Sequence, residues 1–436
     1  MIWVYRIVFL PLFLLALPYY GYRMLKRGGY GENFAERFGG GQWPSAKKEK
    51  FRIWVQAVSV GELLAVETLL RELQKTPSLE IVLTTTTSTG YQLARQRYAG
   101  LALAIRYFPI DFWWFSKRTW DSLQPDLVVH MESEGWPEHL HQARQRKIPV
   151  VLANARLSDR SFRRLRRFPA GARFLVRHFT HILAASPEDR DRWLELGAEQ
   201  TVLTGNLKVD ANLAEPMSKA DREQWRKSSR LGEGPIILGS STWPGEESML
   251  LQIMETFRAQ GISLRLLLVP RHAERRNEIR KVLEASDWTY AFRTDPSSSA
   301  TSMKDLDVYV ADTTGELSRW TQIADVVVVG KSFPPHHGGQ TPVEAALLEK
   351  PLVVGPQMEN FRAIVRSLRE TGAAVQVSAP SELENALKRL VNDETLKNAM
   401  VLATQRWREM NRGATKRTLT ILQNYLPNNS TRPSEE

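Results

Sequence analysis

Short apolar runs alternate with amphipathic helical patterns from Phe51 onward, and this alternation restricts the chain to the α/β class. The runs are continuously apolar, as is typical of parallel strands that are covered on both faces of a sheet. Helical patterns such as Leu63–Leu73 and Glu188–Leu196 lie between them. The strands predicted in this first series are Ile53–Val58, Ile81–Thr85, Leu127–Met131, Val150–Ala153, Ile182–Ala185 and Thr201–Leu203.

The same alternation of apolar runs and helical patterns starts again after a polar, less periodic stretch at Asp210–Gly234, which we interpret as the linker. The predicted strands of this second series are Ile236–Gly239, Leu264–Val269, Val308–Val310, Val326–Val329 and Leu352–Val354. Its predicted helices are Glu246–Arg258, Ala273–Glu284, Pro342–Leu348 and Ser381–Val391. Because 436 residues exceed one ordinary core, we predict two doubly wound, Rossmann-like domains that face each other across a cleft.

The N-terminal segment predicts a membrane anchor. Ile7–Tyr22 is uncharged and mostly apolar, with Arg6 before it and Arg23, Lys26 and Arg27 after it. No small-residue cleavage signal follows, and the excess of positive charge after the segment places the body in the cytoplasm. The segment is short for a span and contains Pro11 and Pro18, so a single-pass and a monotopic anchor both remain open. The predicted boundaries are 1–22 for the anchor, 23–210 and 211–426 for the domains, and 427–436 for a disordered tail.

The charge balance favours an anionic partner. The formal net charge is +11, which suits nucleic acid, a phospholipid surface or a phosphorylated substrate. Arg160–Arg177 holds seven arginines interleaved with phenylalanines, and the anchor makes lipid the preferred interpretation of this run over nucleic acid. The chain has no cysteine, and the adjacent His336 and His337 cannot easily share one ion, so we predict no catalytic metal.

The loop after Val326–Val329 is the clearest candidate ligand site. Gly338 and Gly339 precede a helical pattern that opens at Pro342, and glycines beside a helix N-terminus let an anion approach the backbone. Glu344 lies in the first turn, where its carboxylate would accept a hydrogen bond from a sugar hydroxyl. The alternative is that Thr341 caps the helix and Glu344 complements its dipole.

Polar residues also follow several other predicted strands. Glu62 follows Ile53–Val58 at a helix start, where it serves either as a general base or as a dipole-stabilising acid. Glu132 and Glu134 follow Leu127–Met131, and one of these carboxylates is interpreted as functional and the other as structural. The remaining candidates are Lys208 after Gly205-Asn206, Arg271 and His272 after Pro270, and Thr314, Gly315 and Glu316 after Val308–Val310.

An ordered series of motifs makes the chain resemble a known family. These are S-V-G-E (59–62), T-T-T-T-S-T-G (84–90), M-E-S-E-G-W-P (131–137), N-A-R-L-S-D-R-S (154–161), T-G-N-L-K-V-D (204–210), V-P-R-H-A-E-R (269–275), D-T-T-G-E-L (312–317) and G-P-Q-M-E-N-F (355–361). Together they are similar to the 3-deoxy-D-manno-octulosonic acid (Kdo) transferases of lipopolysaccharide biosynthesis, which are membrane-associated glycosyltransferases of the GT-B fold. The resemblance extends from the anchor to about Tyr425.

The resemblance implies that CMP-Kdo is the donor and a phosphorylated lipid A precursor the acceptor, with inversion at the anomeric carbon. It implies no cofactor, no metal and no nucleic acid, and a site on the cytoplasmic side of the inner membrane. The N-terminal domain would bind the acceptor and the C-terminal domain the CMP-sugar. Glu62 would be the base, while Glu132 and Lys208 would stabilise the transition state. The implied donor contacts are Pro270, Arg271, Thr314, Gly315, Glu316, Thr341, Pro342, Val343 and Glu344.

Two motifs depart from the family pattern. G-K-S (330–332) and G-G-Q-T-P-V-E (338–344) replace the usual G-G-S and G-G-H-N-P-L-E, and E-S-E-G-W-P-E (132–138) replaces E-T-E-L-W-P-N. The resemblance therefore implies the donor and leaves the acceptor and the number of sugars added open. Two alternatives stay open: a GT-B transferase or epimerase for another nucleotide sugar, and a non-catalytic membrane-tethered binder of phosphorylated lipid.

Overall fold

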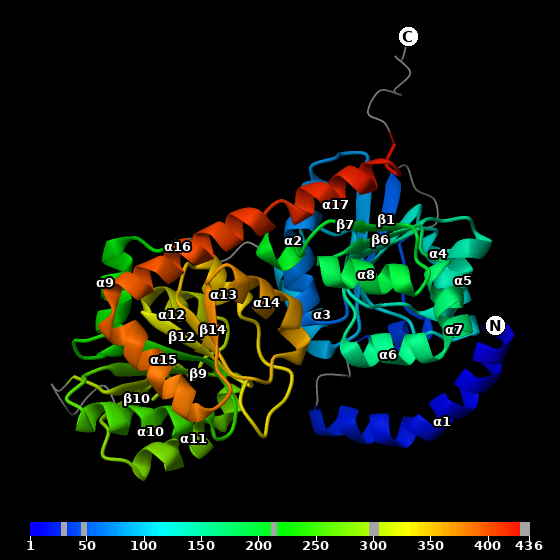
Figure 1. The fold of residues 1–436 in the computed structure, drawn as a ribbon. Helices are drawn as coiled ribbons and strands as arrows, with labels where there is room; N and C mark the ends of the chain where they lie inside the picture. Colours follow the sequence, from blue (N-terminus) through cyan, green and yellow to red (C-terminus); the bar gives the residue numbers. More distant parts are fainter. Residues whose placement is uncertain (28–32, 45–49, 211–215, 296–304, 428–436) are drawn as a thin grey trace. The chain divides into compact units, whose positions relative to one another are not determined.

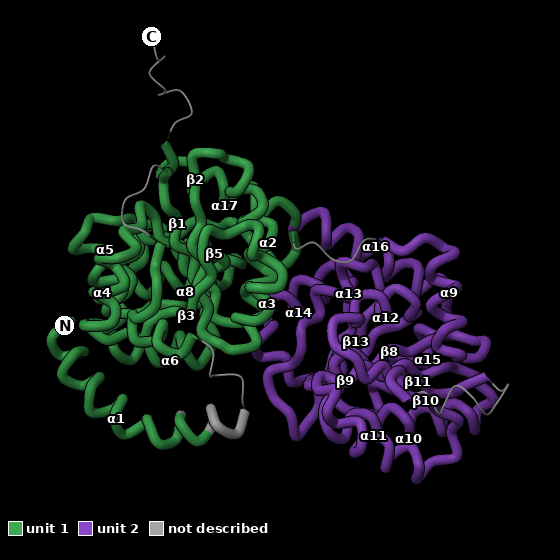
Figure 2. Tube along the Cα trace, turned by 180° about the vertical axis from the view of Figure 1, so that it is seen from behind, with its two compact units in different colours: residues 1–211, 412–436 green, residues 212–411 purple. Residues whose placement is uncertain are grey.

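Apolar and β-branched residues form the central strands of two parallel sheets, one in each of two structural units. The computed structural model describes residues 1–27, 33–44, 50–210, 216–295 and 305–427. Unit 1 comprises residues 1–211 and 412–436, and unit 2 comprises residues 212–411 (Figure 2). Both units are α/β, which confirms the fold class expected from the alternating pattern.

The sheet of unit 1 has the strand order β3-β2-β1-β4-β5-β6-β7, and its strands are parallel (Figure 1). Its strands are β1 (Phe51–Gln56), β2 (Leu79–Thr85), β3 (Ala104–Tyr107), β4 (Leu127–Met131), β5 (Val150–Ala155), β6 (His181–Ala184) and β7 (Thr201–Leu203). All six predicted strands of the first series are present. The edge strand β3 was not predicted, because one face of it is only half-buried and its residues alternate in burial.

Helices cover both faces of this sheet, so successive residues of one strand enter different cores. Ile53 and Val55 of β1 belong to one apolar cluster, whereas Trp54 belongs to the other. The helices of unit 1 are α2 (Val60–Gln74), α3 (Ser88–Tyr98), α4 (Trp113–Leu123), α5 (Pro137–Gln145), α6 (Asp159–Arg167), α7 (Pro169–Val176), α8 (Pro187–Glu195) and α17 (Ala414–Gln423), with 3-10 turns η1 (Phe34–Phe38) and η2 (Leu207–Val209).

The predicted C-terminal boundary of the second domain is wrong. The range 211–426 was assigned to that domain, but the chain returns to unit 1 at Arg412. The reason is that Ala414 and Leu422 of α17 are buried in a core cluster of unit 1. Asp210 also accepts hydrogen bonds from the N–H groups of Gly413 (2.9 Å) and Thr415 (2.6 Å). The predicted tail at 427–436 lies outside the described residues except for Pro427.

The sheet of unit 2 repeats the architecture, with the order β10-β11-β9-β8-β12-β13-β14. Its strands are β8 (Ile236–Thr242), β9 (Arg265–Pro270), β10 (Tyr290–Phe292), β11 (Val308–Val310), β12 (Val326–Val329), β13 (Leu352–Val354) and β14 (Ala374–Gln376). The five predicted strands are present. The two edge strands β10 and β14 were missed, because each has only three residues and one or two of these are only half-buried, which gives too short an apolar pattern.

The predicted linker at Asp210–Gly234 contains a helix and is therefore longer than the true connection. The helices of unit 2 are α9 (Lys219–Ser229), α10 (Glu246–Ala259), α11 (Arg276–Glu284), α12 (Leu317–Ile323), α13 (Val343–Leu347), α14 (Arg362–Glu370), α15 (Pro380–Asn392) and α16 (Glu394–Asn411), with 3-10 turns η3 (Ala273–Arg275) and η5 (Glu359–Phe361). A capping box at Ser218 and Asp221 starts α9. Trp225 then packs edge-on against the buried Trp320, with ring centroids 4.6 Å apart, and this contact holds an otherwise polar helix to unit 2.

The N-terminal apolar segment forms helix α1 (Ile2–Arg27), which belongs to unit 1 and contains Pro11 and Pro18. Its stretch Ile2–Tyr19 is long and apolar enough to cross a membrane, and only 6% of it is buried within the protein. The predicted anchor at Ile7–Tyr22 lies inside this helix. The helix begins at Ile2, before the first residue of the predicted apolar segment. Its first turns include Tyr5 and Arg6, which contact the surface of unit 1.

Candidate functional site

Both sheets place polar residues at the point where the strand order reverses. In unit 1 the first strand, β1, lies between β2 and β4, so the connections after β1 and β4 leave in opposite directions. Ligands of open parallel sheets bind at the carboxyl ends of the strands beside such a point. Glu62 follows β1 and Glu132 follows β4, so the fold places both predicted residues at this position.

Glu62 is a nearly buried carboxyl group at the third residue of α2. It is 8% exposed, and its two oxygens accept hydrogen bonds from the Val58 N–H (2.8 Å) and the Ser59 hydroxyl (3.1 Å). Burial first, and then the negative charge of Glu132, raise the pKa of the Glu62 carboxyl to about 8. A carboxyl group with such a pKa is matched to proton transfer near neutral pH. The same contacts also stabilise the start of α2, so both interpretations of Glu62 agree with the geometry.

Glu132 and Lys208 form an ion pair across the carboxyl edge of the sheet. Lys208 Nζ donates to Glu132 Oε1 at 2.7 Å, and Arg156 Nη1 lies 3.7 Å from the same oxygen. Burial opposes ionisation of Glu132, but the two cations outweigh it and hold the pKa of Glu132 below its usual range. Glu132 therefore remains charged beside Glu62.

Backbone geometry brings these side chains together. Glu132 has a left-handed φ of 56°, and its N–H donates to Ala153 O at 2.9 Å. Lys208 lies in η2, which Asn206 caps by accepting the Lys208 N–H at 3.0 Å. Glu134, the second acid of the cluster, has a pKa raised to about 7 mainly by burial, with a further contribution from Glu132. Within the described part of the chain, no ion pair joins Glu134 to a cation, and it remains a neighbour of the pair.

In unit 2 the corresponding reversal lies between β8 and β12. The loop after β12 is held by Glu246, a 4% exposed carboxylate at the start of α10. Its oxygens accept the N–H groups of Lys331 (2.8 Å), Ser332 (3.1 Å) and Trp243 (2.9 Å). Three oriented N–H donors fix the start of the predicted donor loop. The sequence analysis did not identify Glu246 as a site residue, although an acid in a first helical turn after a strand was the available signal.

The two glycines of this loop have a different role from the predicted one. The N–H groups of Gly338 and Gly339 already donate within the protein, to Glu359 Oε2 (2.7 Å) and Lys331 O (3.2 Å). Both residues have left-handed φ angles, 95° and 70°, and a Cβ would approach Asn360 at 2.5 Å and Met358 at 2.4 Å. The glycines therefore allow the turn and its close packing, and their N–H groups are not open to an anion.

Glu344 is the strongest ligand candidate of unit 2. It lies in the first turn of the short helix α13, and its Oε1 is buried with no hydrogen-bond partner among the residues that the structure describes. Burial raises the pKa of Glu344 to about 7. A buried acceptor without a donor is costly, and a hydroxyl of a bound ligand would supply that donor. The predicted Thr341 cap is wrong, because Pro342 occupies the N-cap position of α13 without a side-chain cap, and Thr341 Oγ1 makes only a long contact of 3.4 Å with the Val343 N–H.

The other predicted donor-binding residues of unit 2 differ in their solvent exposure and in their partners. Pro270 ends β9, and the exposed Arg271 follows it with its N–H bonded to Thr242 O at 3.1 Å. Glu316 is paired with Arg293 at 3.2 Å, and hydrogen bonds from Thr313 and Arg293 outweigh burial and lower its pKa. The remaining members are Thr314 and Gly315, which are exposed, and Pro342 and Val343, which are buried at the start of α13.

Several residues beside these candidates were missed. Arg156, which lies in the motif at 154–161, contacts Glu132. The Lys331 ammonium lies over the Trp243 ring, 4.5 Å from the ring centroid. His336 Nε2 lies 2.7 Å from Pro244 O, so this histidine is tied to the same loop region. Among the described residues, no three His, Asp or Glu side chains gather in a way that would hold a metal ion. The expected absence of a metal remains a prediction.

Comparisons with known proteins identify the family and the fold. A family model described as 3-deoxy-D-manno-octulosonic-acid transferase (kdotransferase) matches residues 32–211. The chain is 32% identical to 3-deoxy-D-manno-octulosonic acid transferase of Haemophilus influenzae over 422 residues, which cover 95% of this chain and 96% of the relative. The enzyme of the same name from Bordetella pertussis is 32% identical and covers 93% of this chain and 94% of its own length.

The solved structure of S. aureus MnaA with UDP resembles the chain with a TM-score of 0.60 and 14% identity, over 88% of this chain and 100% of that one. At this identity the likeness shows the fold alone. Together with the two parallel sheets, it identifies the fold class as GT-B. The extent and identity of the sequence matches show that the chain belongs to the 3-deoxy-D-manno-octulosonic acid transferase family of glycosyltransferases.

Proposed function

We propose that this protein transfers Kdo from CMP-Kdo to a lipid A precursor of the lipid IVA type, with inversion at the anomeric carbon. The observation that carries this proposal is Glu62, a nearly buried carboxyl group whose pKa of about 8 is set by burial and by Glu132. It lies at the strand-order reversal of unit 1, in a chain that aligns along 95% of its length with a Kdo transferase.

In the proposed reaction, the Glu62 carboxylate takes the proton of an acceptor sugar hydroxyl. The hydroxyl oxygen forms a bond to the anomeric carbon of Kdo while the bond from that carbon to the CMP phosphate oxygen breaks. CMP leaves with the electron pair, so protons and charge balance without an added reactant. Lys208 and Glu132 keep a fixed charge pattern beside Glu62, and a positioned base contributes roughly a hundredfold to ten-thousandfold.

The donor half of the proposal rests on unit 2. Glu344 has an unpartnered buried oxygen that suits a ribose hydroxyl, and the exposed Arg271 suits a phosphate. The first N–H groups of α13 have no acceptor within the helix and add to this polarity. Thr314, Gly315, Thr341, Pro342 and Val343 complete the proposed donor contacts, whereas Glu316 would act mainly through its partner Arg293. No metal or organic cofactor enters the scheme.

The acceptor is proposed to reach the protein at the inner membrane, on its cytoplasmic side. Helix α1 supplies an apolar surface, and α6 has no buried residue and exposes arginines at 160, 163, 164, 166 and 167. Basic side chains attract phosphorylated lipids and anionic bilayers. This helix follows β5, so it begins at the same edge of the sheet as Glu62 and Glu132.

The test is to incubate purified protein with CMP-Kdo and a tetra-acylated, bis-phosphorylated lipid A precursor and to weigh the product. A product heavier by Kdo, with CMP released in equal amount, supports the proposal, and the number of added units gives the multiplicity. Competition between CMP and UDP for the protein separates this function from that of a transferase or epimerase for another nucleotide sugar. Lipid binding without CMP release would leave only a non-catalytic binder.

A further inference from the structure

The N-terminal end of α1 is fixed to unit 1 by a buried polar latch. Arg6 donates from Nε and Nη2 to the two oxygens of Glu138, each at 2.8 Å, and Glu138 is fully buried. The Tyr5 hydroxyl donates to Asp111 Oδ2 at 2.6 Å. Asp111 in turn accepts the N–H groups of Glu138 (3.1 Å) and His139 (2.9 Å), so the two contacts form one network.

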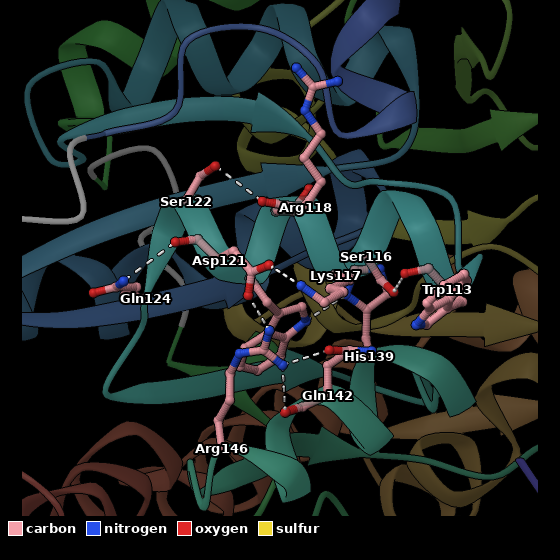
Figure 3. A network of polar contacts seen from close by, with 12 residues as sticks. Trp113, Ser116, Lys117, Arg118, Asp121, Ser122, Gln124, His139, Gln142 and Arg146 are labelled. Atoms are coloured by element: carbon pink, nitrogen blue, oxygen red, sulfur yellow. Dashed lines mark hydrogen bonds and ion pairs between the residues drawn. The ribbon is translucent and has the colours of Figure 1, made fainter.

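The latch is attached to a rigid platform made by α4 and α5. Trp120 Nε1 of α4 donates to His139 Nδ1 of α5 at 3.1 Å. Within α4, Lys117 Nζ donates to Asp121 Oδ2 at 2.6 Å (Figure 3). Figure 3 also shows Arg146 of the α5 end reaching Asp121 of α4. Two helices tied together in this way give α1 a fixed point of attachment.

Only one stripe of α1 faces this platform. Tyr5, Phe9 and Phe13 stack along the helix at four-residue spacing, and the Phe9 ring lies 6.1 Å from that of Phe112. The opposite face is apolar and exposed, with Leu15 at 78% exposure. The other exposed large residues on that face are Trp3, Val4, Ile7, Leu10 and Leu14. A face of this kind in water would be unfavourable, whereas in lipid it is stable.

The C-terminal end of α1 is also held close to unit 1. Helix α1 ends at Arg27, and η1 begins at Phe34 against the same unit. Phe38 of η1 packs edge-on on Phe115 at 5.3 Å, and Glu36 Oε2 accepts the Tyr107 N–H at 2.9 Å. Seven residue steps reach about 25 Å at most, which is less than the roughly 30 Å of a bilayer core. Both ends of α1 are therefore restricted to the side on which unit 1 lies.

We propose that α1 is a monotopic anchor that lies in the plane of one leaflet of an anionic bilayer, and that the Arg6–Glu138 and Tyr5–Asp111 latch sets its orientation. This inference rests on the membrane attachment in the proposed function and decides its topology. Trp113 and Trp114, 43% and 68% exposed, stand beside the latch, with Arg6 5.6 Å from the Trp113 ring centroid. Exposed tryptophans favour the headgroup level, which places this end of α1 at the membrane surface.

The orientation has a consequence for the reaction. Asp111 follows β3 and Glu138 follows β4, so the latch lies at the carboxyl edge of the sheet, like Glu62 and Glu132. Figure 1 shows α1 curving along the lower edge of unit 1 in that view, below α6 and α7. An in-plane α1 thereby turns the edge that carries the base toward the lipid surface, and a lipid-linked acceptor reaches Glu62 while its acyl chains stay in the membrane.

The test exploits the absence of cysteine from the chain. In isolated membranes, a Phe9→Cys, Phe112→Cys variant is treated with a short bis-methanethiosulfonate, and cross-linked peptides are measured by mass spectrometry. The Phe9→Cys, Phe112→Cys variant is expected to cross-link efficiently. The Leu15→Cys, Phe112→Cys variant is expected to give no cross-linked peptide, because residue 15 is on the lipid-facing side of α1. Arg6→Gln added to the first pair is expected to reduce the yield, whereas Arg222→Gln, an equal change of charge at an exposed position of α9 in unit 2, leaves it unchanged.

A second measurement distinguishes the two topologies directly. In intact spheroplasts, a membrane-impermeant maleimide is expected to leave Ile2→Cys unlabelled, like the body control Gln423→Cys. Labelling of Ile2→Cys alone, or a membrane-bound protein without the Phe9–Phe112 cross-link, overturns the in-plane anchor and leaves the proposed transferase function standing. Recovery of the protein in the soluble fraction overturns the membrane attachment as well, and the product assay then decides separately on Kdo transfer.

Discussion

The Lys208 ammonium donates to Glu132 Oε1 at 2.7 Å, although the two residues are 76 positions apart in the chain. This pair keeps a negative charge beside Glu62, and that charge is the second cause, after burial, of the raised pKa of Glu62. The electrostatics of the proposed base thus depend on a contact that joins the β4 and β7 ends of the sheet.

Replacing Glu132 with Gln is expected to move the pH dependence of transfer to lower pH. A base works only when unprotonated, so wild-type kcat/KM is expected to fall as pH decreases through about 8. Removing the charge of residue 132 lowers the pKa of Glu62 and shifts the acidic limb downward. The measurement is a pH profile of kcat/KM, with the distant surface change Glu255→Gln as control. An acidic limb that stays in place would show that Glu132 does not set this pKa.

The two interpretations of Glu62 make different predictions for two substitutions. Gln at position 62 still accepts the Val58 N–H and removes a buried ionisable group, so Glu62→Gln is expected to lose no thermal stability and to keep CMP binding while transfer falls roughly a hundredfold to ten-thousandfold. Glu62→Ala is expected to lose the hydrogen bonds from the Val58 N–H and the Ser59 hydroxyl as well, which costs about 1 kcal/mol of unfolding free energy. Unchanged turnover of Glu62→Gln would leave only the capping role.

Glu344→Gln is expected to separate ligand binding from stability. Burial raises the pKa of Glu344 to about 7, so the folded protein holds this proton more tightly than the unfolded chain does, and ionisation of the buried group destabilises the fold progressively as pH rises from about 4.5 to 7. The variant should therefore be more stable than the wild type at pH 8, by roughly 1–3 kcal/mol of unfolding free energy, with no difference at pH 4. Calorimetric unfolding at both pH values checks this.

The same variant should bind CMP more weakly. Replacing the carboxylate by an amide removes the negative charge from the proposed acceptor, and a hydrogen bond to a charged group exceeds a neutral one by about 1 kcal/mol. Isothermal titration with CMP measures the change, and Glu349→Gln near the end of the same helix region is the control. Equal affinity of variant and wild type would mean that Glu344 does not touch the nucleotide.

Glu246→Gln is expected to loosen the loop that begins at Lys331. The Gln side chain offers one acceptor oxygen where Glu246 uses two, and its NH₂ group would face an N–H donor. We expect a loss of about 1–3 kcal/mol in unfolding free energy together with weaker CMP binding. Glu255→Gln changes an exposed acid on the same helix α10 and should leave both quantities unchanged.

Much of the architecture followed from local sequence. The buried strands were predictable because strands covered on both faces must be apolar at every position, as Val326–Val329 is. The edge strands β3, β10 and β14 were not, since a strand with an open face lacks that continuous signal. Helix α17 could not be assigned to its unit, because its apolar positions fit any core and only the buried Ala414 and Leu422 show which one they enter.

The sequence by itself determined the α/β class, the two sheets, the apolar N-terminal segment and the chemical types at the strand ends, since these depend on periodicity and on residue identity. Tertiary structure alone decided which of those side chains meet. It paired Glu132 with Lys208, left one oxygen of Glu344 without a donor, occupied the N–H groups of Gly338 and Gly339, and attached Arg6 to Glu138. The physical reason is that burial, charge neighbours and hydrogen-bond partners come from residues far apart in the chain, which the fold alone brings together.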